Sequence, residues 1–321
     1  MLVALGCRSL PVARVDEMNF ELLRVAAAIA GTGAAAWEDH RTSFIDDRIT
    51  FSMIGLGFLL NLWAWLGEGS WNFFWTATAP ALLLLGIGYV FYRFGQLGGG
   101  DVLLFAGLQL LLPFYPAVTL APLQEATGLQ LPWLVRDALA LNWPFFFSVF
   151  VASSVLAMGG SGLQYAALLL KKHRDLRGLR PDLPSLALSL LAVAVPYSLF
   201  GTRLSPAQSS FFAAVFLPGI FLVSFKKQLM DEVVVRKIRI EEVEDEDILA
   251  LDKMDEKLVK KYGLERVLTK DQVARLKKIR KEKKIARFPV CKVLPRYGPY
   301  LFAALLLCLL VGDLLFWILV L

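Results

Sequence analysis

Four acidic residues stand where apolar segments of membrane length begin or end. They are Asp39, Asp46, Asp47 and Asp101. Asp101 follows three consecutive glycines, Gly98, Gly99 and Gly100, and directly precedes the apolar run VLLFAGLQLLLP. A carboxylate at the edge of hydrocarbon is costly unless it caps a helix, pairs with another group or reacts. These residues are therefore the first candidates for chemistry.

Two carboxylates held side by side share one proton, because two like charges a few ångströms apart cannot both ionise easily. The ionised member can activate a water molecule, and the protonated member can protonate the scissile carbonyl oxygen or the leaving amine. Such a pair hydrolyses a peptide bond without a metal or a covalent nucleophile. The glycines before Asp101 suit this chemistry, since bare backbone lets an extended substrate come close.

Other site types have little support in the composition. The chain contains two histidines, His40 and His173, and its three cysteines are far apart with no CxxC spacing. The sequence therefore predicts no metal site, no cofactor and no disulfide framework.

The same residues also have structural interpretations. Asp101 suits the N-cap of a helix, and the glycines could form an ordinary connection. The three other aspartates could lie in a hydrated loop. Residue types and spacing alone do not choose the partner of Asp101.

Composition predicts an all-α polytopic membrane protein. Hydrophobic residues make up 57% of the 321 residues, and the mean hydropathy is +0.57. The apolar residues gather in runs of about 20, the length that crosses a bilayer as a helix. These runs predict about eight transmembrane helices, over 19–38, 48–66, 72–92, 101–120, 143–170, 184–204, 208–225 and 298–321.

Charge predicts the orientation. If the N-terminus lies outside, the inner loops and their flanks contain 29 Lys and Arg, and the outer segments contain 5. Positive residues accumulate on the cytosolic side, so the four aspartates lie near the cytosolic boundary. Asp313 lies about 22 Å deeper along the last helix and cannot meet them.

Four segments are expected along the chain. Residues 1–18 form an N-terminal extension, with Met18 as an alternative start, and 19–225 form the membrane domain. Residues 226–297 form a small basic cytosolic α(+β) domain, and 298–321 form the last helix. The basic domain shows no aromatic stacking pattern, so contact with solvent or anionic headgroups is expected and nucleic-acid binding is not.

The motifs resemble those of the archaeal preflagellin and type IV prepilin peptidases, membrane aspartyl proteases of the GxGD type. The run from Gly98 to Asp101 matches the GxGD motif. The segment DHRTSFIDD, which begins at Asp39, is similar to the pattern around the first aspartate of the family. The tail FPVCKVLPRYGPYLFAALLLCLLVGD also resembles that of the archaeal members. Ser43 and Leu103 depart from the pattern, where relatives often have Arg and Lys.

The resemblance implies Asp39 and Asp101 as the catalytic pair and Gly98 to Gly100 as the substrate-approach loop. It further implies cleavage of basic leader peptides from prepilins or preflagellins at the cytosolic face of an archaeal plasma membrane. The expected partners are these substrates and the lipid bilayer. Presenilin-like proteases fit less well, because Pro80-Ala81-Leu82 precedes the GxGD motif instead of following it.

Two non-enzymatic alternatives belong to other classes. A transporter could use Asp101 for ion or proton binding, but its carboxylates would be expected near the membrane midplane, often with repeat symmetry. An inactive pilus-assembly factor could use 226–297 as a docking surface.

Overall fold

The computed structural model describes residues 15–69, 71–94, 97–116, 144–173, 178–200, 206–243, 247–283, 285, 287–293 and 295–311. Most of the predicted N-terminal extension, and Asp313, lie outside these residues.

A helix lies within or across each of the apolar ranges predicted from the sequence. These helices are α1 (Val15–Thr42), α2 (Asp47–Glu68), α3 (Trp71–Arg93), α4 (Gly99–Leu111), α7 (Phe145–His173), α8 (Leu183–Phe200), α9 (Pro206–Ser224) and α13 (Gly298–Val311). By length and composition, three spans in the described part of the chain could cross a membrane: Asp47–Gly67, Trp71–Arg93 and Phe145–His173. Four further apolar helices are shorter. The helical class is supported, whereas the count of about eight crossings is not confirmed.

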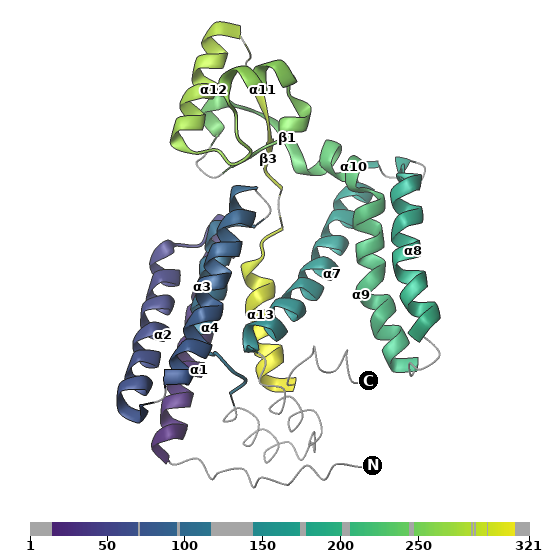
Figure 1. Cartoon of the computed structure of the whole chain (residues 1–321). Coiled ribbons are helices and arrows are strands. Elements are labelled where there is room, and N and C mark those ends of the chain that lie inside the picture. Colours follow the sequence, from purple (N-terminus) through teal and green to yellow (C-terminus); the bar gives the residue numbers. More distant parts are fainter. Residues whose placement is uncertain are drawn as a thin grey trace.

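The helices form two groups joined through α13. Helices α2 and α3 both pack on α4, and α8 packs on α9 (Figure 1). Helix α13 contacts α1 on one side and α7 on the other, and α7 contacts α9. The main apolar core lies where α1, α4, α7 and α13 meet, around Leu104, Leu108, Val149, Leu301 and Leu305. Helix α13 thus completes the packing of α1.

Helix α7 is continuous through Gly159, Gly160 and Gly162. A Cβ atom at Gly160 would collide with the phenol of Tyr300 on α13, and one at Gly162 would lie 2.9 Å from Cβ of Pro218 on α9. These glycines therefore serve close helix packing.

The described residues of 226–297 form an α+β unit beyond the ends of the helices (Figure 1), and its first turns, at Leu229 and Val233, pack on Tyr165 and Leu169 of α7. Its elements are α10 (Lys226–Leu229), a π-helical turn (Met230–Val234), β1 (Val235–Arg239), β2 (Ile248–Leu249), α11 (Glu256–Tyr262), α12 (Lys270–Lys283) and β3 (Arg287–Cys291). The antiparallel sheet has the order β1-β3-β2, with Val235 opposite Cys291. Leu268, Leu276, Ile279, Phe288 and Val290 are fully buried in the core of the unit.

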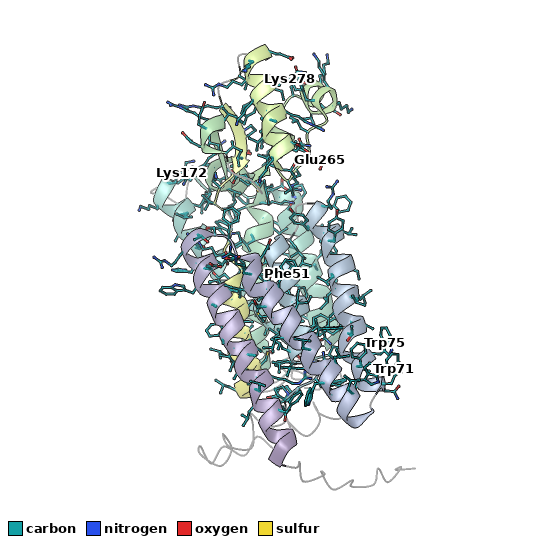
Figure 2. All side chains as sticks on the ribbon, turned by 90° about the vertical axis from the view of Figure 1, so that its left-hand side faces the viewer. Phe51, Trp71, Trp75, Lys172, Glu265 and Lys278 are labelled. Atoms are coloured by element: carbon teal, nitrogen blue, oxygen red, sulfur yellow. The ribbon has the colours of Figure 1, made fainter. Side chains whose placement is uncertain are left out.

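Aromatic and charged side chains mark opposite ends of the molecule. Trp71 and Trp75 lie at the end of the helices far from the α+β unit, on which Glu265 and Lys278 lie (Figure 2). Tryptophan favours the membrane–water interface, and lysine and arginine favour the cytosolic side. Arg93 at the end of α3 lies 3.6 Å from Glu265, an ion pair between the helices and the unit.

The core of the α+β unit gives a first prediction. Leu276→Ala removes a fully buried side chain and should lower the free energy of unfolding by about 2–5 kcal/mol. The matched control is Lys278→Ala, because this side chain is exposed on the same helix. Thermal unfolding of the full-length protein in detergent, read together with limited proteolysis, tests the difference. Equal stability of the two variants would contradict the assigned core.

Candidate active site

Asp39 and Asp101 lie at the same end of the helix bundle, the end that faces the α+β unit (Figure 1). Asp39 is in the last turn of α1, and Asp101 is in the first turn of α4. Asp39 is 7% exposed and Asp101 is partly buried. Their carboxylates are close enough for the charge of Asp39 to act on Asp101. The fold therefore brings together two carboxylates that are 62 positions apart in the sequence.

Asp39 is held by the start of α13 and the residues just before it. Its Oδ2 atom accepts a hydrogen bond of 2.8 Å from the backbone N–H of Gly298. The positive charge of Arg296 also favours the ionised form of the Asp39 carboxyl group. The first N–H groups of a helix have no partner within the helix and favour negative charge. The site thus provides a donor and a cation for an ionised Asp39.

Asp101 is not the N-cap of α4. The helix begins at Gly99, the N-cap is Gly98, and Asp101 is the third helical residue. From there its carboxylate accepts from the backbone N–H of Gly98, in the manner of an acidic residue that reaches back within a capping box. The structural role suggested by the sequence is therefore corrected: Asp101 supports the helix start from inside the first turn.

The three glycines differ in their surroundings. A Cβ atom at Gly98 would lie 2.9 Å from Oδ2 of Asp101, and one at Gly100 would lie 3.0 Å from Cβ of Ile45. A Cβ atom at Gly99 would meet the Tyr92 ring at 3.4 Å, which is ordinary contact. Gly98 and Gly100 therefore have packing reasons to be glycine that do not depend on a substrate.

Asp46 and Asp47 occupy a different environment. Both side chains are exposed, and Asp46 caps α2 by accepting the N–H of Arg48 at 2.8 Å. The backbone N–H of Asp46 in turn donates to Glu38 at 2.8 Å. The structure therefore gives Asp46 a capping role in the loop between α1 and α2.

Sequence reasoning did not identify Arg296, Tyr297 and Gly298 as neighbours of the pair. The phenol of Tyr297 lies 2.6 Å from Oγ of Ser153 on α7, and the Tyr297 ring centroid lies 6.1 Å from that of Phe105. Burial raises the pKa of Tyr297, and the charge of Asp101 acts in the same direction. The only signal in the sequence was the resemblance of the tail, which includes PRYGPY, to that of the archaeal peptidases. That resemblance did not predict which residues these side chains contact.

Two cavities in the described part of the chain lie away from the two aspartates. One of about 410 Å³ is at the opposite end of α1 and α4, between Phe20, Arg24, Phe73 and Leu111. Another of about 450 Å³ lies between α1 and α2, with Arg48 at one end. Neither is lined by Asp39 or Asp101. Within the ranges the structure describes, no three His, Cys, Asp or Glu side chains gather as metal ligands do.

Comparison with known proteins agrees with the motifs. Residues 26–162, which include both aspartates, match the type IV leader peptidase family. Over these residues the chain is similar to that family, as the two motifs predicted. A stretch of 132 residues is 34% identical to the prepilin peptidase EppA of Methanothermobacter thermautotrophicus. This stretch covers 39% of the chain and about a third (34%) of that relative. No solved structure is significantly similar to the chain.

The glycine run provides a prediction that needs no assay of activity. Gly100→Ala crowds Ile45 and should lower the free energy of unfolding by about 1–3 kcal/mol. Gly99→Ala should be neutral or stabilising, since alanine is the better helix former and its methyl group finds ordinary contact. Thermal unfolding midpoints of the two purified variants in detergent provide the comparison. A Gly99→Ala protein less stable than Gly100→Ala would contradict the packing described.

Proposed function

We propose that this protein is a membrane aspartyl endopeptidase that removes basic leader peptides from prepilins or preflagellins at the cytosolic face. The observation that carries the proposal is the position of Asp39 and Asp101 in terminal turns of α1 and α4, at the same end of the helix bundle and within residues 26–162, which match the family. Hydrolysis by a carboxylate pair needs only these groups and water, and EppA, which matches part of the chain, is a prepilin peptidase by name.

In the first step Asp39 acts as the base. It is the member of the pair with the better support for negative charge, because Gly298 donates to it and Arg296 lies near it. Asp101 then carries the shared proton. Asp39 removes a proton from water, the hydroxyl oxygen bonds to the scissile carbonyl carbon, and the proton of Asp101 passes to the carbonyl oxygen.

In the second step the tetrahedral intermediate collapses. The bond between carbon and nitrogen breaks, and Asp39, now protonated, gives its proton to the leaving amine. The intermediate returns the proton of one hydroxyl group to Asp101 as the new carboxyl terminus forms. Both aspartates thereby regain their starting states, and the net reaction consumes one water molecule.

Charge and aromatic residues support the cytosolic position of the pair. Of the 34 Lys and Arg, 21 lie between Lys226 and Arg296, in the unit next to the aspartates. Trp37, two residues before Asp39, is 64% exposed and has the Arg41 guanidinium 5.6 Å from its ring. Trp and Arg together favour the interface between membrane and water. A substrate whose leader remains in the cytosol would present its cleavage site at this depth.

A transport function has less support. Asp39 and Asp101 lie in terminal turns of α1 and α4, whereas the coupling ions of transporters usually bind near the membrane midplane.

Substitution of the pair tests the proposed function. Asp39→Asn and Asp101→Asn should each lower the cleavage rate at least about 100-fold, because each removes an acid or base that the other cannot replace. The assay is processing of an archaeal prepilin by membranes that contain each variant in equal amount. Asp46→Asn and Asp47→Asn are the controls and should retain most activity, since both side chains are exposed. An active Asp39→Asn variant beside an inactive Asp46→Asn variant would overturn the pairing.

Gly98 links the glycine motif to the reaction. The methyl group of Gly98→Ala would press on Oδ2 of Asp101 from 2.9 Å, so the cleavage rate should fall by about 10- to 100-fold. Gly86→Ala is the matched control, because a Cβ atom on this glycine of α3 meets nothing within 4 Å. Initial rates of prepilin cleavage measure both variants. Equal rates would show that Asp101 tolerates displacement and would contradict the role of Gly98.

A further inference from the structure

Three consecutive residues, two just before α13 and the first of α13 itself, each contact a different part of the candidate site. Arg296 donates to the backbone carbonyl of His40 and, at 3.2 Å, to Oγ of Ser43. The phenol of Tyr297 lies 2.6 Å from Ser153 on α7, and the N–H of Gly298 lies 2.8 Å from Asp39. This segment, Arg296–Gly298, lies outside the residues that match the family.

The contact of Gly298 leaves no space for a side chain. Gly298 is buried, and a Cβ atom there would lie 3.0 Å from Oδ2 of Asp39 and 3.2 Å from the Cα atom of Ala36. Its backbone is not in the left-handed region, so the limit is steric and concerns Asp39 directly. The hydrogen bond fixes one carboxylate oxygen of Asp39.

Arg296 holds the chain on the C-terminal side of Asp39. Arg296 donates to two acceptors at the end of α1. His40 is the residue after Asp39, and Ser43 is four residues after it. Ser43 has a φ of 62°, a left-handed conformation that is unusual for serine. The guanidinium thereby joins a strained helix end to the segment and brings a positive charge near the carboxylate.

We infer that Arg296–Gly298 is a third element of the active site, which positions Asp39 and keeps it as the base of the pair. The inference rests on the proposed peptidase function. Gly298 orients the carboxylate, Arg296 favours its ionised form, and Tyr297 anchors the segment to α7. Arg296 and Gly298 are positioning residues, because they act through Asp39.

The groups that face Asp39 allow a test by pH. They are Asp101 from α4, Arg296 from the segment and His40 from α1 itself, whereas Asp46, just before α2, and Asp47, its first residue, are exposed to solvent. Arg296 favours the ionised form of Asp39, so its removal makes Asp39 keep its proton to higher pH. The acidic limb of the pH–rate profile, which requires ionised Asp39, should then move to higher pH.

Arg296→Gln should move this limb upward by up to about one pH unit, and Arg296→Lys should restore much of the original position. The measurement is the rate of prepilin cleavage against pH for the full-length protein in detergent micelles. A merely structural arginine would lower the rate at every pH without a shift. A profile of Arg296→Gln that coincides with the wild type would overturn the role of Arg296.

Gly298→Ala tests the orientation of Asp39. It should lower kcat by about 100-fold, with a small change in KM, because the misplaced carboxylate no longer aims at the water. Gly159→Ala on α7 is the matched control, since a Cβ atom there meets nothing within 4 Å. Thermal unfolding identifies any loss of folded protein, and the pH profile of Arg296→Gln tests the inference without this variant. Wild-type kcat in folded Gly298→Ala would contradict the positioning role.

The two proposals fail in different ways. A wild-type protein that cleaves no prepilin, or that cleaves equally with Asp39→Asn, overturns the peptidase function and this inference with it. A wild-type protein that cleaves prepilin and loses activity only with Asp39→Asn and Asp101→Asn supports the peptidase. If Arg296→Gln and Gly298→Ala then both behave as the wild type, the inference alone is overturned.

Discussion

The site depends on holding two carboxylates together at the end of an apolar helix bundle. Two unit charges 4 Å apart repel by about 4 kcal/mol at an effective dielectric constant of 20, and burial adds a further cost for each charge. A shared proton removes the repulsion and leaves one charge to be stabilised. The surroundings of Asp39 supply what that charge needs, in the N–H of Gly298 and the nearby Arg296.

The helix ends near the two aspartates affect how well each carboxylate holds a negative charge. Asp39 lies at the C-terminal end of α1, where the helix dipole disfavours a negative charge by about 0.3–1 kcal/mol. The N-terminus of α13, which meets Asp39 through Gly298, acts in the opposite direction and adds a hydrogen bond. Asp101 lies at the N-terminus of its own helix, which favours a negative charge, but the negative charge of Asp39 opposes ionisation of Asp101. Three helix ends therefore converge on one pair, and in the proposed mechanism their polarity determines which carboxylate carries the proton.

The sequence predicted those features of the candidate site that depend on local pattern. The apolar runs located the helices, and the position of Asp39 and Asp101 at helix ends followed from where those runs stop. The choice of Asp39 over Asp46 and Asp47 needed the family motif, because all three have the same charge and similar depth. The capping of α2 by Asp46 is also local, yet the pattern IDDR does not distinguish a capping aspartate from a reacting one.

Long-range contacts were not accessible in the same way. The hydrogen bond between Asp39 and Gly298 joins residues 259 positions apart, and no periodicity or charge pattern predicts such a pairing. The packing of Gly100 on Ile45 and of Gly160 on Tyr300 is likewise a property of assembled helices. A glycine in the sequence indicates bare backbone, but only the neighbouring element shows whether a substrate or a side chain uses the space.

The α+β unit enters the architecture of the site through the chain that leaves β3. The N–H of Lys292 donates to the carbonyl of Val234 at 3.1 Å, and the phenol of Tyr165 on α7 donates to the carbonyl of Val293 at 2.9 Å. Five positions after Val293, Gly298 meets Asp39. The segment that touches the aspartate is thus fixed at one end by the unit and α7, and at the other by α13. A loop without these attachments would need to lose conformational entropy of about 1–2 kcal/mol per residue to hold Gly298 in place. The α+β unit and α13 meet that cost through their own folding and so hold Gly298 beside Asp39.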